Sequence, residues 1–92
     1  MVNKPSVYVM LLSNNQYYVG STDNIARRLR EHNHGKTKST RFKRPVRLIF
    51  SEKFDSLVLA RRVEYKIKRL KSRKIIEQII KMGKIDTKLL GD

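Results

Sequence analysis

Two strand-forming runs separated by Asn14-Asn15 constrain the fold of this chain more than any other feature. Ser6–Ser13 is β-branched and aromatic at its start and apolar on both faces, a pattern typical of a strand in the centre of a sheet. The Asn-Asn pair favours a tight turn, and Gln16–Thr22 then resumes strand character. These residues are therefore predicted to form a β-hairpin.

Three helices and one further strand are predicted after the hairpin. In chain order, a helix, a strand and two helices are expected over Asn24–His34, Val46–Phe54, Leu57–Lys71 and Arg73–Met82. Asp23 is expected to cap the first helix, and Asp86 a last short turn. The predicted fold class is α/β in the broad sense (α+β): a three-stranded, mainly antiparallel sheet flanked by helices, in the order β-β-α-β-α-α. A chain of 92 residues has room for one domain, taken as 1–92, with a single modest core.

The net charge predicts the class of partner. Twenty-two Lys and Arg residues stand against eight Asp and Glu residues, for a formal net charge of +14. Such a chain attracts polyanions in a salt-dependent way, and nucleic acid is the most obvious of them. A structural RNA-binding protein, or a basic surface without a specific partner, would have the same charge. Charge alone therefore predicts a nucleic-acid partner and does not predict an enzyme.

The composition also excludes several kinds of protein. The chain has no cysteine, which excludes disulfides and thiolate metal sites and fits a reducing compartment. It has no apolar run near the roughly 20 residues of a membrane span. We therefore expect a cytoplasmic protein with no membrane partner.

Glu64 is the one acidic residue whose position calls for a particular explanation. It lies along the edge of the apolar stripe that Ala60, Val63, Ile67 and Leu70 form on the predicted helix. A carboxylate at such a position is costly unless it is paired or bound to a metal. Helix geometry leaves two interpretations open, a metal ligand and an ion pair with one of the many nearby Lys and Arg residues.

Five motifs, by their order and spacing, resemble those of one known family. The hairpin holds Ser6-Val7-Tyr8 and, ten residues after that tyrosine, Tyr18-Val19-Gly20. Residues 27–36, 44–50 and 60–70 then read R-R-L-R-E-H-N-H-G-K, R-P-V-R-L-I-F and A-R-R-V-E-Y-K-I-K-R-L. Together they resemble the GIY-YIG endonuclease superfamily, in particular its stand-alone single-domain group, which is similar to the N-terminal nuclease domain of the bacterial excision-repair incision enzyme. The resemblance covers nearly the whole chain.

The resemblance implies a function and a set of site residues. It implies a metal-dependent endonuclease that hydrolyses phosphodiester bonds of nucleic acid, with DNA favoured, in DNA repair, recombination or processing. The implied catalytic residues are Tyr8, Tyr18, Arg28, His32 and Glu64. Glu64 is implied to hold one divalent metal, Mg²⁺ or Mn²⁺, and Gly20 to let the backbone approach the site; no small-molecule cofactor is implied. Ser6 departs from the glycine of the first motif, and no counterpart is found for the late asparagine of some members.

The chemistry of phosphodiester hydrolysis gives these residues distinct roles. Arg28 and His32 lie at i and i+4 and share a helix face, so both can reach one pocket. Arg28 would stabilise phosphate charge, and His32 would orient the water or a tyrosine hydroxyl. Either Tyr8 or Tyr18 would be the general base, and the sequence does not distinguish them. Without the resemblance, the tyrosines read as packing aromatics and Arg28 and His32 as exposed helix residues.

Two basic segments are predicted to hold the nucleic-acid backbone. The first is the loop between the first helix and the third strand, and the second follows the Glu64 helix. The predicted contacts are Lys36, Lys38, Arg41, Lys43, Arg44, Arg61 and Lys68. Phe42 in the loop is expected to pack on the sheet rather than to stack on a base.

The register of the hairpin tests the site hypothesis. In a hairpin, the two residue numbers of each cross-strand pair add up to a constant. With a constant of 29, Tyr8 and Tyr18 face opposite sides of the sheet, and with a constant of 28 both tyrosines face the same side. We predict 28. The hypothesis also requires Tyr8, Tyr18, Arg28, His32 and Glu64 to line one basin, and a Glu64 carboxylate on the far side of the sheet from Arg28 would contradict it. Two rivals remain: a non-catalytic DNA- or RNA-binding domain on the same scaffold, and an enzyme that cleaves only with a targeting partner.

Overall fold

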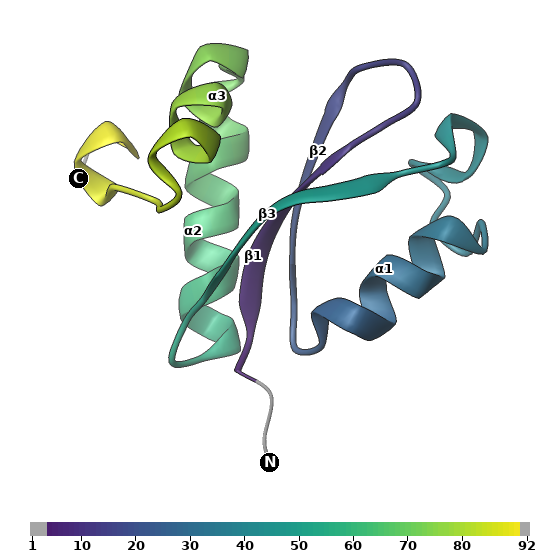
Figure 1. Ribbon diagram of the computed structural model, residues 1–92. Helices are drawn as coiled ribbons and strands as arrows, with labels where there is room; N and C mark the ends of the chain where they lie inside the picture. Colours follow the sequence, from purple (N-terminus) through teal and green to yellow (C-terminus); the bar gives the residue numbers. More distant parts are fainter. Residues whose placement is uncertain (1–3, 91–92) are drawn as a thin grey trace.

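The computed structural model describes residues 4–90 and has the predicted order of elements. Its strands are β1 (Ser6–Leu11), β2 (Tyr17–Thr22) and β3 (Arg47–Lys53). Its α-helices are α1 (Ile25–Asn33), α2 (Leu57–Leu70) and α3 (Arg73–Met82), and the 3₁₀ turns are η1 (Arg41–Lys43) and η2 (Thr87–Leu90). Within the described residues the fold is a three-stranded antiparallel sheet with three α-helices, in the order β-β-α-β-α-α (Figure 1), which confirms the predicted fold class.

The sheet order β2-β1-β3 places β1 in the centre, as its two apolar faces predicted. Val7 and Val9 belong to the core on one face, and Tyr8 and Met10 to the core on the other; all four are buried. Because β1 takes both sets of backbone hydrogen bonds, β2 is left as an edge strand with one open side. This open edge of β2 is where the two halves of the candidate site meet.

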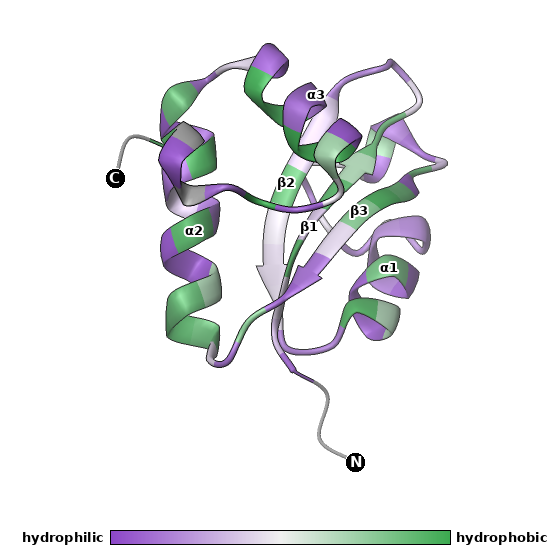
Figure 2. Ribbon diagram, turned by 60° about the vertical axis from the view of Figure 1, so that its left-hand side comes forward, coloured by the Kyte–Doolittle hydropathy of each residue, from purple (hydrophilic) through white to green (hydrophobic). Residues whose placement is uncertain are grey.

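The helices divide between the two faces of the sheet. Figure 1 shows α2 and α3 on one side of the strands and α1 on the other. The first face is packed by Ala60, Val63 and Ile67 of α2, and the second by Ile25 and Leu29 of α1. Hydrophobic residues alternate with hydrophilic ones along each helix (Figure 2), as expected for helices with one face on a sheet and one in water. None of the helices within residues 4–90 is long and apolar enough to cross a bilayer.

The hairpin register confirms the predicted sum of 28. Tyr8 pairs with Gly20, and Met10 pairs with Tyr18. The turn is longer than two residues: the Leu12 N–H donates to the Gln16 carbonyl, and Asn15 takes a left-handed conformation with φ of 67°. The longer loop places Tyr8 and Tyr18 on the same face of the sheet, the face covered by α1.

The cap of α1 differs from the prediction by one residue. The Asn24 side chain accepts the Arg27 N–H at 3.0 Å, so Asn24 rather than Asp23 is the N-cap. Asp23 instead pairs with the Arg27 guanidinium. Both residue types cap well, and the choice follows from where the strand ends. The prediction for Asp86 is confirmed, since its Oδ1 accepts the Lys88 N–H at 3.0 Å.

Two residues predicted to pack are exposed instead. Phe42 was expected on the sheet, but it lies in η1 with 87% of its surface exposed and the Arg41 guanidinium 5.1 Å from its ring centroid. Leu70 was placed in the buried stripe of α2, but it is 39% exposed because the helix ends there. The next residue, Lys71, has φ of 49° and turns the chain toward α3.

Candidate active site

The position of Gly20 is fixed by the ring of Tyr8. Tyr8 extends from β1 across the neighbouring strand, with its ring against the backbone of Gly20. A Cβ at position 20 would lie 2.5 Å from Tyr8 Cζ, a distance that real Cβ atoms do not reach. Glycine is therefore required for space rather than for its backbone angles, and it lets the Tyr8 hydroxyl reach the β2 edge.

The Tyr8 hydroxyl joins a buried chain of polar groups. It lies 3.3 Å from Arg28 Nε, which donates to it, and 3.3 Å from His32 Nε2. The other ring nitrogen, His32 Nδ1, lies 2.7 Å from Thr40 Oγ1. Tyr8, His32 and Thr40 are 1%, 0% and 0% exposed. Strand β1, helix α1 and the basic loop thus meet in one hydrogen-bonded chain.

Burial sets the charge states in this chain. It raises the pKa of Tyr8 to about 12, against the opposing effect of the hydrogen bond from Arg28. It lowers the pKa of His32, and the nearby Arg28 charge acts in the same direction. The hydrogen bond to Tyr8 raises the pKa of the Arg28 guanidinium. At neutral pH the group therefore consists of a phenol, a neutral imidazole and one cation.

Tyr18 connects this chain to α2. Its ring centroid lies 6.3 Å from that of Tyr8 and 4.9 Å from that of His32, with the His32 ring edge-on at 68°. On its other side, Lys68 Nζ of α2 lies 5.7 Å from the Tyr18 ring centroid. Tyr18 is half-buried, so it is more accessible to a ligand than Tyr8.

Glu64 approaches the same strand from the opposite face. Its Oε1 accepts a hydrogen bond from the Ser21 hydroxyl of β2, and its Oε2 pairs with Lys68 Nζ at 2.6 Å. The Glu64 side chain is 20% exposed. Both interpretations of this carboxylate therefore stay open: the ion pair is present, and the carboxylate lies at the open edge of β2, where a ligand can reach it.

The α1 side and the α2 side meet around the end of β2. A cavity of about 200 Å³ is lined by Ser21 and Thr22 of β2, Arg28 and Glu31 of α1, and Arg61 of α2, among others. Glu64 does not line this cavity but is joined to it through Ser21. The Glu64 charge also contributes to raising the pKa of Tyr8. Tyr8 thus bonds both Arg28 and His32, and Tyr18 packs beside the Tyr8 and His32 rings. Of the five predicted residues only Arg28 lines the cavity. They do not line one basin as the site hypothesis required, because Glu64 lies on the α2 face and is joined to the cavity only around the edge of β2, through Ser21.

The predicted nucleic-acid contacts fall into three groups. Lys36, Lys38 and Arg41 are exposed in the loop, while Lys43 donates to Gln16 Oε1 at 3.1 Å and Arg44 donates to the Arg41 and Asn33 carbonyls at 2.8 and 3.3 Å. The latter two therefore hold the loop in place. Arg61 and Lys68, on α2, lie beside Ser21 and Glu64 respectively.

Two residues of this arrangement escaped the sequence analysis, Ser21 and Thr40. Ser21 follows the Tyr18-Val19-Gly20 motif directly, and strand alternation places it on the α2 face, where a helix carboxylate was to be expected. No local sequence pattern predicts the role of Thr40, because Thr40 contacts His32 only when the basic loop folds back onto α1.

The donor set limits how a metal could be held. Within residues 4–90, no three His, Asp or Glu side chains gather as ligands of one ion. A hard cation such as Mg²⁺ is often held by one or two carboxylates, with water and substrate phosphate completing its shell. Glu64 at the open edge fits that kind of site.

Comparison with known proteins agrees with this geometry. The GIY-YIG catalytic domain matches residues 4–76. The chain belongs to the GIY-YIG family. This GIY-YIG domain is 42% identical over 79 residues to a UPF0213 protein of Bacillus velezensis, covering 85% of this chain and 79% of the relative. It is 48% identical over 65 residues to a UPF0213 protein of Halobacterium salinarum, covering 70% and 84%.

The fold is also similar to a solved structure. The solution NMR structure of the UPF0213 protein BH0048 from Bacillus halodurans matches this GIY-YIG domain with a TM-score of 0.57 and 35% identity. The match covers 86% of this chain and 84% of the other.

Proposed function

We propose that this GIY-YIG domain is a metal-dependent endonuclease that hydrolyses phosphodiester bonds in nucleic acid, with DNA as the preferred substrate. The observation that carries the proposal is the Tyr8 hydroxyl, bonded to both a guanidinium and an imidazole beside the strand edge that holds Glu64. The net charge of +14 supports a polyanionic substrate.

Glu64 would hold one Mg²⁺ or Mn²⁺ by taking the cation in place of Lys68 at Oε2. When bound, such a cation neutralises phosphate charge and makes a bound water more acidic. The Ser21 hydroxyl, which bonds the other carboxylate oxygen, would keep Glu64 pointed at the β2 edge during this exchange.

Arg28 is proposed to bind the phosphate and, in doing so, to expose Tyr8. Its Nη1 now lies 3.2 Å from Glu31 Oε1, in an ion pair that is about two-thirds buried. A phosphate in the adjacent cavity competes with Glu31 for the guanidinium, whose fork of donors suits two phosphate oxygens. Tyr8 is almost fully covered and Arg28 Nε donates to its hydroxyl, so we propose that Tyr8 reaches water when Arg28 turns toward the phosphate.

Tyr8 and His32 are proposed to carry the proton. As the attacking water forms its bond to phosphorus, the phosphorus–oxygen bond opposite it breaks, and the leaving oxygen takes a proton from solvent. Tyr8 accepts a proton from the attacking water and passes its own to His32 Nε2. This transfer requires His32 to be neutral with its proton on Nδ1, donated to Thr40 Oγ1. The lowered pKa of His32 keeps that neutral state available at neutral pH. The same proton transfer by Tyr18, the more accessible phenol, is the competing assignment.

Exposed cations would hold the rest of the substrate. Lys36, Lys38 and Arg41 are exposed in the basic loop, and Arg61 lines the same cavity as Arg28. Phe42, exposed beside Arg41, offers a stacking surface for an unpaired base. These contacts position the backbone without reading its sequence.

A non-catalytic nucleic-acid-binding domain is the second candidate function. It is favoured by the pairing of Glu64, because both carboxylate oxygens already have protein partners and need no metal for stability.

Substitution Glu64→Gln separates the two functions. The protein is incubated with labelled single- and double-stranded DNA and RNA, with Mg²⁺, with Mn²⁺ and in EDTA. We expect wild type to cut in metal, and E64Q to bind as wild type does and not to cut. Glu77→Gln is the matched control, because Glu77 also accepts from a hydroxyl, that of Tyr17, and pairs with a cation, Arg73. Binding without cutting by wild type in every condition would favour the second candidate.

A further inference from the structure

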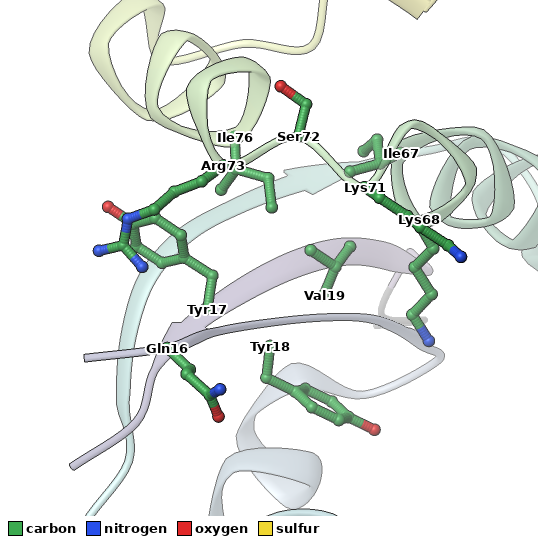
Figure 3. A pocket seen from close by; sticks show the side chains of 10 residues that line it. All are labelled: Gln16, Tyr17, Tyr18, Val19, Ile67, Lys68, Lys71, Ser72, Arg73 and Ile76. Atoms are coloured by element: carbon green, nitrogen blue, oxygen red, sulfur yellow. The ribbon is translucent and has the colours of Figure 1, made fainter. Parts of the chain in front are cut away.

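A second hollow lies on the α2 side of the hairpin, next to the candidate active site. This groove, of about 420 Å³, runs between β2 and the junction of α2 with α3. Figure 3 shows Val19, Ile67 and Ile76 between two walls, with Arg73 over the Tyr17 ring on one side and Lys68 extending toward Tyr18 on the other. The groove therefore has an apolar floor and a cationic rim.

The Tyr17 wall is fixed by its own contacts. The Arg73 guanidinium lies 4.2 Å from the Tyr17 ring centroid and donates to the Asn15 carbonyl at 2.8 Å. Tyr17 also donates its hydroxyl proton to Glu77 Oε2 at 3.3 Å. These contacts tie the hairpin tip to α3 and use the charge of Arg73, so this wall shapes the groove rather than attracting a ligand.

The opposite wall carries two cations, one of them without an ion-pair partner in the part of the chain that the structure describes. Lys71 lines the groove, and among residues 4–90 its ammonium group forms no ion pair. Lys68 lines the groove too, and its partner is Glu64. No acidic side chain lines the groove. An anionic ligand with an apolar part matches this combination of charge and floor.

We propose that the groove binds one nucleotide adjacent to the scissile phosphate, with its base on the Val19, Ile67 and Ile76 floor and its phosphate at Lys71 and Lys68. The groove is continuous with the candidate site because Tyr18 and Lys68 belong to both. This inference rests on the proposed function only in placing the scissile phosphate at the β2 edge. An unpaired base is required, since a base inside a duplex cannot lie on the floor.

The direct test is a methyl NMR titration with a thymidine trinucleotide in EDTA, where no cleavage interferes. Isoleucine δ1 methyl groups are labelled, and we expect the Ile67 and Ile76 signals to shift. Ile79 and Ile85 are internal controls, because both are core residues outside the groove. Unmoved Ile67 and Ile76 signals, or shifts of backbone signals at the rim alone, would overturn the proposal. Shifts that grow with protein concentration before nucleotide is added would assign the groove to a second copy and also overturn it.

Lys71→Asn is the matching variant, since asparagine tolerates the left-handed conformation at this position. We expect it to weaken trinucleotide binding by about threefold to tenfold, the size of one lost phosphate contact. Lys84→Asn removes the same charge from an exposed residue outside the groove and should leave affinity nearly unchanged. An equal loss of trinucleotide affinity in both variants would show that only the net charge of the protein matters, and it would contradict the subsite.

The subsite and the nuclease proposal fail in different ways. Cleavage by wild type with no methyl shift would overturn the subsite and leave the nuclease. Methyl shifts that K71N weakens, in a protein that cuts nothing, would support the subsite and overturn the nuclease.

Discussion

The α1 side and the α2 side of the candidate site differ in how completely they are formed without a ligand. On the α1 side, Tyr8, His32 and Thr40 are buried and joined by hydrogen bonds, so packing fixes their geometry. On the α2 side, Glu64 and Lys68 form a partly exposed ion pair at the edge of the sheet. The buried hydrogen bonds of the α1 side can keep a path for a proton aligned. The exposed ion pair of the α2 side can exchange the Lys68 ammonium group for a metal ion. A site that handles both a proton and a metal needs one part of each kind.

The tyrosine substitutions test the α1 side and should have the largest effect. Tyr8→Phe keeps the ring packing but removes the hydroxyl that bonds Arg28 and His32. We expect single-turnover cleavage to fall by about 10²–10⁴-fold, the range for loss of general acid-base catalysis. Tyr18→Phe should lower cleavage by about tenfold or less, below the range for loss of a general base, because Tyr8 would still carry the proton. The reverse order would move the proton transfer to Tyr18 and break the comparison.

Gly20→Ala tests whether space at the strand edge holds Tyr8 in place. The added methyl would meet the Tyr8 ring, so we expect a loss of about 1–3 kcal/mol in the free energy of unfolding and reduced cleavage by the folded protein. Gly83→Ala is the control: its φ of 73° costs about 1–2 kcal/mol, but nothing lies within 4 Å of the new methyl. Urea unfolding and cleavage assays measure both variants. Normal cleavage by folded G20A would contradict the role given to Tyr8.

The pH dependence of stability tests the burial of His32. Because its pKa in the folded protein lies below the ordinary 6.5, the unfolded chain binds the proton first as pH falls. The stabilisation is fully present above about pH 6.5 and is lost as pH falls through the folded-state value, with a slope of at most about 1.4 kcal/mol per pH unit. Urea unfolding between pH 7.5 and 5 measures it. His32→Gln should flatten the slope and the exposed-site variant His34→Gln should keep it; equal slopes in wild type and H32Q would contradict the buried neutral imidazole.

Lys68→Gln tests the exchange proposed for the α2 side and should have the smallest effect. Without the competing ammonium group, Glu64 should bind Mn²⁺ about twofold to fivefold more tightly, the range set by a partly exposed ion pair. Lys84→Gln removes an equal charge from an exposed residue outside the site. Calorimetric titration with Mn²⁺ compares the two variants. Weaker Mn²⁺ binding by K68Q than by K84Q would mean that Lys68 does not compete for the metal position.

The sequence predicted what local patterns and strand alternation determine. The order of elements, the central position of β1 and the shared face of Tyr8 and Tyr18 were all predictable, the last because a common active surface needs a register sum of 28. The choice of Asn24 over Asp23 as cap depends on a one-residue shift at the strand end, which composition does not set.

Long-range packing decided the remainder. Phe42 was misplaced because a 3₁₀ turn, rather than an extended loop, carries it away from the sheet. Thr40 was missed because its partner lies eight residues away across a folded loop. Arg28 and Glu64 lie on helices that pack on opposite faces of the sheet, and residues of both helices line one cavity at the edge of β2. This arrangement follows from the sheet order, which the sequence alone did not specify. The single-domain organisation and the catalytic roles of the site residues stay predictions.

Paramagnetic broadening by Mn²⁺ tests the central claim most directly. In ¹⁵N-labelled protein, substoichiometric Mn²⁺ should first broaden the amide signals of Ser21, Glu64 and Lys68, because the ion would sit where the Glu64 carboxylate meets β2. E64Q should abolish this broadening and E77Q should retain it. Broadening centred on another carboxylate, or unchanged in E64Q, would show that the carboxylate at the edge of β2 does not hold the metal.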